Sequence, residues 1–135
     1  MVVPEVLEAV RRAFAASAVH AVAAYVFGSV ARGDAGPESD LDLAVILGGD
    51  RRSALPNGPL LDLVAALERA TGRRVDLALL DAASPDFIHR VLRDGILVHE
   101  RDALARVAFE VDARNAYFDL LPTLRAYRRA AIRSA

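Results

Sequence analysis

The sequence predicts an α/β (α+β) fold, in which a small mixed β-sheet carries helices packed mainly on one face. Short apolar runs that fit buried strands alternate with longer segments in which apolar residues recur at helical spacing. The first two apolar runs lie too close together for a full helical crossover, so we expect a mixed sheet. Because 135 residues, 54% of them hydrophobic, suffice to bury one core, we expect a single domain over residues 1–135.

The N-terminal half should hold one helix and two strands. Pro4 suits the first turn of a helix, and the apolar residues that follow it recur at helical spacing. Residues 22–27 and 41–47 are apolar runs that fit buried strands, each followed by glycine. Between these strands, residues 29–39 contain several Gly, Asp and Pro residues, so they can hold only a short helix and a loop.

The next part of the chain should add a helix and a third strand. A polar loop over residues 50–58 precedes a helix at about 60–70. Gly72 stands where a left-handed residue would end that helix. An apolar run at 75–80 predicts the third strand.

The C-terminal part should hold two helices around a short strand. Ser84, followed by proline, should cap a helix that Gly95 closes, and a short fourth strand is expected at 96–98. Asp102 is placed to cap a long C-terminal helix, which Pro122 should kink or break. The inner stripe of this helix is expected to consist of Leu104, Val107, Val111 and Phe118.

The composition excludes several kinds of chemistry. All 17 basic residues are arginine, and the chain contains neither lysine nor cysteine. Schiff-base and P-loop lysines, cysteine nucleophiles, thiolate zinc sites and disulfides are therefore excluded. The formal net charge is -1, which argues against a broad basic surface, so we expect no direct nucleic-acid binding.

A long uncharged stretch bears on where the protein resides. Residues 13–31 carry no charged side chain, but they are rich in alanine, interrupted by polar residues and preceded by two glutamates. Export signals begin with a basic, acid-free segment, and membrane spans need stronger hydrophobicity, so we expect no membrane insertion. A chain without cysteine suits the reducing cytoplasm, which is the expected location.

Two aspartates should share one face of the second strand. Side chains alternate along a strand, so the apolar residues at 41, 43 and 45 face the core, while Asp40 and Asp42 face the other side, roughly 6.5–7 Å apart along the backbone. Such carboxylates repel one another unless a cation lies between them. Mg²⁺ favours carboxylate and phosphate oxygens, and two ions roughly 3.5–4 Å apart are the usual arrangement for phosphoryl and nucleotidyl transfer.

A third aspartate interrupts the next apolar run. An uncompensated charge at Asp76 would be costly inside such a strand. If the third strand lies beside the second, Asp76 can face the same ions, ligate one of them and accept a proton from an attacking hydroxyl. Alternatively, Asp76 lies at a solvated strand end and pairs with Arg73 or Arg74.

A glycine–serine turn follows the first strand. Gly28 lets backbone amides approach a phosphate, Ser29 adds a hydroxyl donor, and the start of a helix favours anions. Such a turn alone is a weak indication of function. Ten residues separate Ser29 from Asp40, which gives the more specific pattern G-S-x10-D-x-D.

These motifs resemble the nucleotidyltransferase superfamily that includes DNA polymerase beta. The resemblance is carried by the segments 28–34, 39–43 and 74–77 and covers the core from about 22 to 80. On a chain this short it looks like the minimal nucleotidyltransferases, the MntA-type antitoxins that pair with HEPN-domain ribonuclease toxins. It implies a nucleotidyltransferase fold, with a core at about 20–100 and a C-terminal helical segment at about 102–135.

The resemblance implies roles for a few residues. The catalytic and metal-binding residues would be Asp40, Asp42 and Asp76, which would hold two Mg²⁺ ions. The residues that bind the nucleotide, with ATP as substrate, would be Gly28, Ser29 and Arg32. Arg32 is close enough in sequence to steady phosphate oxygens, but it could equally pair with Asp34.

The residues themselves favour nucleotidyl transfer to a hydroxyl, and the resemblance implies ATP as the donor of AMP and a tyrosine of a partner HEPN-type toxin as the acceptor. One alternative is an antitoxin that acts by binding alone. Another is a transferase for small molecules such as aminoglycosides, although those enzymes usually carry an additional helical domain. Four arginines lie near the C-terminus: Arg125, Arg128, Arg129 and Arg133. They form either a basic face that binds a partner or a solvated helix end.

Overall fold

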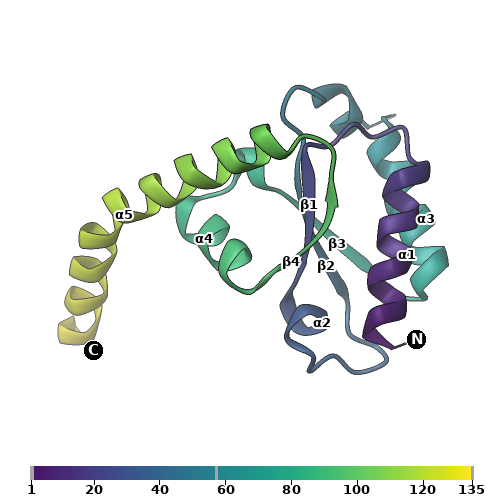
Figure 1. Ribbon diagram of the computed structural model, residues 1–135. Helices are drawn as coiled ribbons and strands as arrows, with labels where there is room; N and C mark the ends of the chain where they lie inside the picture. Colours follow the sequence, from purple (N-terminus) through teal and green to yellow (C-terminus); the bar gives the residue numbers. More distant parts are fainter. Residues whose placement is uncertain (1, 57, 135) are drawn as a thin grey trace.

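Helices and strands follow one another in the order that the sequence predicts (Figure 1). The structure is a computed structural model that describes residues 2–56 and 58–134, without the side chains of Arg51, Arg133 and Ser134. Asn57, which falls in the predicted loop 50–58, lies outside the described residues. The elements are α1 (Val3–Ala16), β1 (Ala23–Phe27), α2 (Gly28–Arg32), β2 (Leu41–Ile46), α3 (Pro59–Thr71), β3 (Val75–Leu79), α4 (Pro85–Asp94), β4 (Ile96–Glu100) and α5 (Ala103–Ser134), with 3-10 turns at Arg51–Ala54 and Leu80–Ala82.

The strands form one sheet in the order β3-β2-β1-β4. β1 is antiparallel to both of its neighbours, β2 and β4, whereas β2 and β3 are parallel and connected through α3. The predicted α/β fold with a mixed sheet is therefore confirmed. Residues that are partners across a parallel pair project to the same face, so the β2–β3 pair can bring side chains of both strands together.

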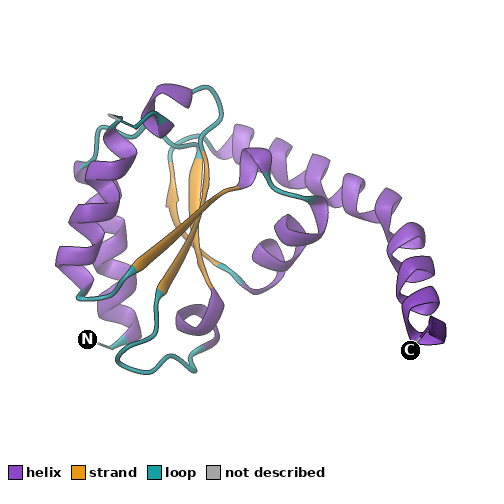
Figure 2. Cartoon of the chain, turned by 180° about the vertical axis from the view of Figure 1, so that it is seen from behind, coloured by secondary structure: helices purple, strands orange, loops and turns teal. Residues whose placement is uncertain are grey.

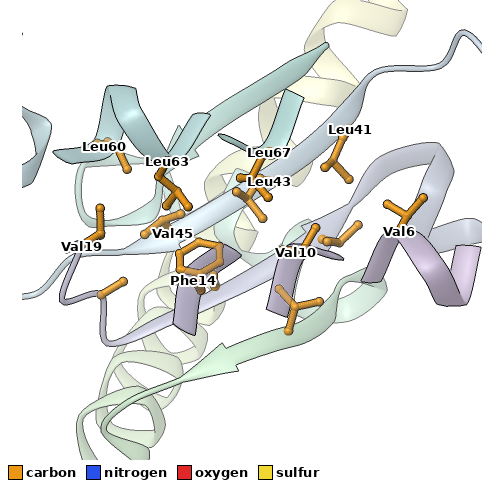
Figure 3. Packing of buried hydrophobic residues seen from close by; sticks show 14 of the residues in the cluster. Val6, Val10, Phe14, Val19, Leu41, Leu43, Val45, Leu60, Leu63 and Leu67 are labelled. Carbon is orange, nitrogen blue, oxygen red and sulfur yellow. The ribbon is translucent and has the colours of Figure 1, made fainter. Parts of the chain in front are cut away.

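The larger hydrophobic core lies between the sheet and the helices α1 and α3. Figure 3 shows the side chains that meet there: Val6, Val10 and Phe14 from α1, Leu41, Leu43 and Val45 from β2, and Leu60, Leu63 and Leu67 from α3. Burying each such side chain stabilises the fold by about 1.5–3 kcal/mol. Because the β2 leucines alternate with Asp42, their burial turns Asp42 to the opposite face.

The opposite face of the sheet carries α4 and the first half of α5 (Figure 2). A smaller core there combines Ala44 and Ile46 of β2 with Ile88 and Val91 of α4 and Ala113 of α5. Helices therefore cover both faces of the sheet. The prediction that they pack mainly on one face is correct only in that the core beneath α1 and α3 is the larger of the two. The physical reason is that β2 is apolar at every position after its aspartate, so both of its faces need cover.

Helix ends follow the local signals that the sequence contains. Gly72 ends α3 with a left-handed φ of 67°. Ser84 Oγ accepts a hydrogen bond from the Phe87 amide at 3.3 Å, and Asp102 Oδ1 accepts one from the Ala105 amide at 3.0 Å. These predicted caps are confirmed because capping depends on residues that are close together in sequence.

The face that α5 turns toward the sheet differs from the prediction. The expected inner stripe is exposed, with 85% of Leu104, 46% of Val107, 44% of Val111 and 64% of Phe118 open to solvent. The helix packs instead through Phe109, Ala113 and Tyr117, which are spaced four residues apart. Tyr25 Oη also donates a hydrogen bond to Glu110 Oε1 at 2.6 Å. The prediction was wrong because hydropathy does not report a contact in which a charged residue faces inward.

α5 runs without interruption from Ala103 to Ser134 although it contains Pro122. Proline lacks an N–H group and clashes with the preceding turn, which bends a helix. The ribbon of α5 changes direction about halfway along its length, so the predicted kink is confirmed and there is no break (Figure 1). Within the described part of the chain, neither α5 nor any other helix is both long and apolar enough to span a membrane.

Candidate active site

Asp42 and Asp76 lie side by side on neighbouring strands. In the parallel pair of β2 and β3, Asp42 is the direct partner of Asp76. Asp40 precedes Asp42 by two positions and therefore projects to the same side. The structure thus brings the three aspartates together at one end of the sheet, on the face that carries α4.

The carboxyl group of Asp42 is electrostatically perturbed. Burial raises its pKa above the usual range, and the negative charges of Asp76 and Asp40 raise this pKa further. The positive charge of Arg32 acts in the opposite direction. Because Asp40 and Asp76 are exposed and Asp42 is partly buried, Asp42 is the carboxylate whose ionised form the fold disfavours.

The loop that leads into β2 is held by Arg73. Its Nη1 donates hydrogen bonds to the carbonyl oxygens of Gly36 at 2.9 Å and Ser39 at 2.8 Å. Ser39 Oγ accepts a hydrogen bond from the Gly36 amide at 2.9 Å, which tightens the turn. Arg73 is thus engaged by the loop, and among the described residues no ion pair joins Asp76 to Arg73 or Arg74.

Gly28 lies directly against the Asp42 carboxylate. A Cβ atom at this position would come within 2.0 Å of Asp42 Oδ2. The φ of Gly28 is +70°, a conformation that other residues rarely adopt. Both features require glycine, which places the backbone of the turn next to the carboxylates.

Ser29 lies in the first turn of α2, immediately after β1. Its carbonyl oxygen accepts a hydrogen bond from the Asp34 amide at 3.1 Å, and Gly33, with a φ of 82°, ends the helix. The first N–H groups of a helix have no partner within it. Since Gly28 touches Asp42, these amides and the Ser29 hydroxyl belong to the same end of the sheet as the aspartates.

Arg32 shows features of both interpretations drawn from the sequence. Its Nε lies 3.4 Å from Asp34 Oδ2, in an ion pair whose side chains are more than half exposed. Such an exposed pair contributes little to stability, typically about 0–1 kcal/mol. Arg32 is also close enough to Asp42 to lower the pKa of that carboxyl. The pairing with Asp34 therefore leaves a positive charge beside the carboxylates.

A pocket of about 420 Å³ opens beside the glycine–serine turn. Its lining includes Phe27, Gly28 and Arg32 on one side and Phe87, Arg90 and Arg93 of α4 on the other. The rings of Phe27 and Phe87 meet edge to face with centroids 5.6 Å apart, and the Arg90 guanidinium lies 5.5 Å from the Phe87 ring centre. Aromatic faces next to arginines suit a nucleoside attached to phosphates. Three larger hollows lie elsewhere, and none of them is lined by Asp40, Asp42 or Asp76.

The contribution of α4 to this pocket was missed by the sequence interpretation. Phe87, Arg90 and Arg93 lie in an amphipathic helix whose arginines have the pattern of a solvated face. Arg93 pairs with the adjacent Asp94 at 2.9 Å. The local sequence does not show that α4 lies beside α2, because this contact depends on how α4 packs on the sheet.

The aspartates fit a divalent cation as donors, although they do not form a ready-made cage. Within residues 2–56 and 58–134, no three His, Cys, Asp or Glu side chains are arranged to hold a metal ion. Mg²⁺ commonly binds one or two carboxylates and completes its shell with waters and substrate phosphates, so a cage is not required. The raised pKa of Asp42 beside two other carboxylates marks a place where a cation would relieve repulsion.

Comparison of the sequence with known proteins identifies the region that contains the site. The family profile described as "Polymerase beta, Nucleotidyltransferase" matches residues 12–104. A solved structure assigned as a minimal nucleotidyltransferase is 35% identical, with 71% of this chain and 95% of that chain covered and a TM-score of 0.54. No curated protein matches the chain.

Chains in solved toxin–antitoxin complexes have the same fold. One, from a toxin–antitoxin with AMP-PNP, is 23% identical, with 95% of this chain and 96% of that chain covered and a TM-score of 0.68. Another, from a tri-AMPylated Shewanella oneidensis HEPN toxin in complex with MNT antitoxin, is 21% identical, with 98% and 97% covered and a TM-score of 0.62. Both likenesses are of fold, and they extend over nearly the whole of each chain.

Proposed function

The chain belongs to the polymerase beta-type nucleotidyltransferase family, and we propose that it uses Mg²⁺ to transfer AMP from ATP to a tyrosine hydroxyl of a partner HEPN-type toxin. The observation that carries the proposal is the placement of Asp76 opposite Asp42, with Gly28 against the Asp42 carboxylate. Carboxylates next to a backbone turn suited to phosphate are the chemical requirements of nucleotidyl transfer.

The aspartates divide the chemistry among them. Asp40 and Asp42, with Asp76 beside them, would hold two Mg²⁺ ions, which neutralise charge on the phosphates and orient the reacting groups. The acceptor oxygen forms a bond to the α-phosphorus of ATP, the bond from that phosphorus to the bridging oxygen breaks, and pyrophosphate leaves. The exposed Asp76 accepts the hydroxyl proton, as a general base does.

The turn and the pocket divide the binding of ATP. Backbone amides at Gly28 and Ser29, with the Ser29 hydroxyl, bind the triphosphate at the start of α2. Arg32 adds a positive charge on the same side. The nucleoside occupies the pocket between α2 and α4, where aromatic side chains supply a surface for stacking.

The choice of acceptor is supported by the likeness in fold. The structures that share it are described as toxin–antitoxin complexes, one with AMP-PNP and another with an AMPylated HEPN toxin. A cytoplasmic location and the absence of direct nucleic-acid binding remain predictions from the composition.

The test is to incubate the protein with Mg²⁺, ATP and the HEPN-type toxin of its pair and to measure the intact mass of the toxin. We expect one or more AMP groups on the toxin, mapped by peptide sequencing to tyrosine. An unmodified toxin under every nucleoside triphosphate would contradict the proposal, whereas modification of an aminoglycoside instead would identify a small-molecule transferase.

A substitution separates catalysis from neutralisation by binding alone. Asp42→Asn removes one charge from the carboxylate cluster, and Asp62→Asn makes the same change at an exposed position of α3. We expect Asp42→Asn to abolish transfer and Asp62→Asn to retain it. If Asp42→Asn still neutralises the toxin fully, the protein acts by binding alone.

A further inference from the structure

An apolar row on α5 is exposed, and among the described residues its one aromatic contact is that of Phe118 with Tyr117 of the same helix. Its members, Leu104, Val107, Val111 and Phe118, are here called the α5 stripe, and none of them belongs to either hydrophobic core. Their spacing of three, four and seven residues places them along one side of the helix over about 21 Å. Rows of large apolar side chains open to water mark sites of interaction.

The rotation of α5 about its own axis is fixed by contacts on its inner side. Glu110 accepts the hydrogen bond of Tyr25 and pairs with Arg106 Nη1 at 3.0 Å. Arg106 also pairs with Glu100 of β4. The Tyr117 ring stacks on the imidazole of His89 in α4, with ring centroids 3.7 Å apart. Turning the stripe inward would break all of these contacts. The helix therefore holds the α5 stripe outward in the folded domain.

The second half of α5 has a strong charge bias. After Asp119 the sequence contains four arginines and no acidic residue. Arg125, Arg128 and Arg129 are exposed on this half, and the side chain of Arg133 lies outside the description. A basic surface that continues from an apolar stripe is complementary to a partner with an apolar face and acidic flanks.

The position of α5 relates this surface to the candidate active site. α4 packs against α5 and also contacts α2, which begins beside the aspartates. The C-terminal end of α5 lies at the same end of the molecule as α2 in both views (Figure 1 and Figure 2). The first half of α5, which carries the stripe, lies toward the other end of the molecule (Figure 1). A protein that contacts both halves of α5 would therefore extend to the end of the sheet that holds the aspartates.

We propose that α5 is the docking element for the acceptor protein. The α5 stripe packs against the apolar face of a helix of that partner, and Arg125, Arg128 and Arg129 pair with acidic residues beside that face. Apolar side chains at intervals of three and four residues fit the surface of another helix. This inference rests on the proposed function, which supplies a HEPN-type toxin as the partner.

A second copy of the chain fits the surface less well. In a parallel pair of α5 helices, the two arginine-rich halves would lie together and repel one another. In an antiparallel pair whose α5 stripes pack together, the two arginine-rich halves would extend in opposite directions. The stripe of the other copy would offer them no acidic residue. The charge pattern therefore favours a partner with a different sequence.

The test compares two substitutions that add the same charge to α5. Val111→Glu places a carboxylate in the α5 stripe, and Ala116→Glu places one at an exposed position about 140° further around the helix. The Kd for the purified toxin of the pair is measured by calorimetry. We expect Val111→Glu to weaken binding at least about tenfold and Ala116→Glu to leave it within about twofold. ATP affinity should be unchanged in both variants.

The charged half is tested separately. Replacing Arg125, Arg128 and Arg129 by serine should weaken toxin binding and reduce its dependence on salt. The variant Asp42→Asn should bind the toxin as the unaltered chain does while losing transfer, which keeps docking distinct from catalysis. Full transfer with an unchanged Kd in Val111→Glu overturns the docking role of α5 and leaves the proposed function intact.

Other occupants give distinct results. Self-association of the unaltered chain that Val111→Glu abolishes, measured by analytical ultracentrifugation, assigns the stripe to a second copy and overturns the inference. Competition between RNA and the toxin for the arginine-rich half, with no effect of Val111→Glu, also overturns it. If the unaltered chain does not bind the toxin at all, two claims are disproved together: that the toxin is the acceptor, and that α5 is its docking element.

Discussion

The imidazole ring of His99 in β4 stacks on the phenyl ring of Phe14 in α1, with centroids 4.9 Å apart and planes inclined by 18°. His99 Nε2 is buried and has no hydrogen-bond partner among the described residues. Burial lowers the pKa of His99 below its ordinary value of 6.5. The folded state therefore disfavours a positive charge on this ring.

The stability of the protein should decrease as the pH falls below about 6.5, because the unfolded chain binds a proton at His99 before the folded chain does. His99→Phe keeps an aromatic ring against Phe14 and removes this titration. Its free energy of unfolding, measured by urea denaturation and circular dichroism, should fall less steeply below about pH 6.5. His20→Gln, at an exposed position, is the control. Equal steepness in His99→Phe and the unaltered chain would contradict the prediction.

A second prediction separates stability from activity at Asp42. Its raised pKa means that the folded state binds a proton there more tightly than the unfolded state does. The stabilisation from this proton is complete below the unfolded pKa and is lost as the pH rises through the folded value. At neutral pH without Mg²⁺, Asp42→Asn should therefore increase the free energy of unfolding. With Mg²⁺ and ATP present, the rate of transfer by this variant should fall at least about a hundredfold. Asp62→Asn should leave transfer unchanged and, because Asp62 lies in the first turn of α3, should lower the free energy of unfolding by at most about 1 kcal/mol. A destabilised Asp42→Asn would contradict the prediction.

A third prediction concerns the coupling between Asp42 and Asp76. The charge of Asp76 raises the pKa of Asp42, so Asp76→Asn should lower that pKa. Carbon-13 NMR of the Asp42 carboxyl in metal-free protein measures the shift directly. Asp86→Asn, on α4, removes an acidic group that does not contribute to the Asp42 pKa and serves as the control. An unchanged Asp42 titration in Asp76→Asn would place the two carboxylates further apart than the sheet register indicates.

Much of the site could be predicted from the sequence because its parts depend on local geometry. Strand alternation puts Asp40 and Asp42 on one side, and a glycine between a strand and a helix predicts a turn with exposed amides. The approach of Gly28 to Asp42 could not be read from the spacing, because it depends on the register between β1 and β2. The aspartates were predictable as a group, while their contact with the turn was not.

The parts that sequence interpretation missed depend on how distant elements pack. The helical periodicity of α5 allows more than one face to point inward, and the hydrogen bond from Tyr25 to Glu110 decides between them. The two residues are 85 positions apart, so no local pattern reports the contact. The arginines of α4 escaped notice for the same reason, since an amphipathic helix shows which residues are polar but not what they face.

A fourth prediction tests the contact that orients α5. Tyr25→Phe removes the donor to Glu110, whereas Glu110 keeps its ion pair with Arg106. The loss of a hydrogen bond to a charged group should lower the free energy of unfolding by about 1.5–3 kcal/mol. Hydrogen exchange should show greater opening of α5 than of α1, which lies on the other face. Tyr127→Phe, at an exposed position of α5, should have no effect. Unchanged protection of α5 in Tyr25→Phe would show that apolar packing alone holds the helix.

A fifth prediction uses two glycines that share a backbone conformation but differ in their surroundings. Gly28 and Gly33 have φ values of 70° and 82°, so alanine is strained at both, by about 1–2 kcal/mol. A Cβ atom would meet Asp42 at position 28 but nothing within 4 Å at position 33. Gly33→Ala should therefore lose stability only by the backbone strain. Gly28→Ala must also displace the Asp42 carboxylate, so it should lose more stability and should bind Mg²⁺-ATP at least about tenfold more weakly. Backbone strain is common to both variants, and only the contact with Asp42 differs. If both variants bind Mg²⁺-ATP equally well, the close approach of Gly28 to Asp42 does not contribute to nucleotide binding.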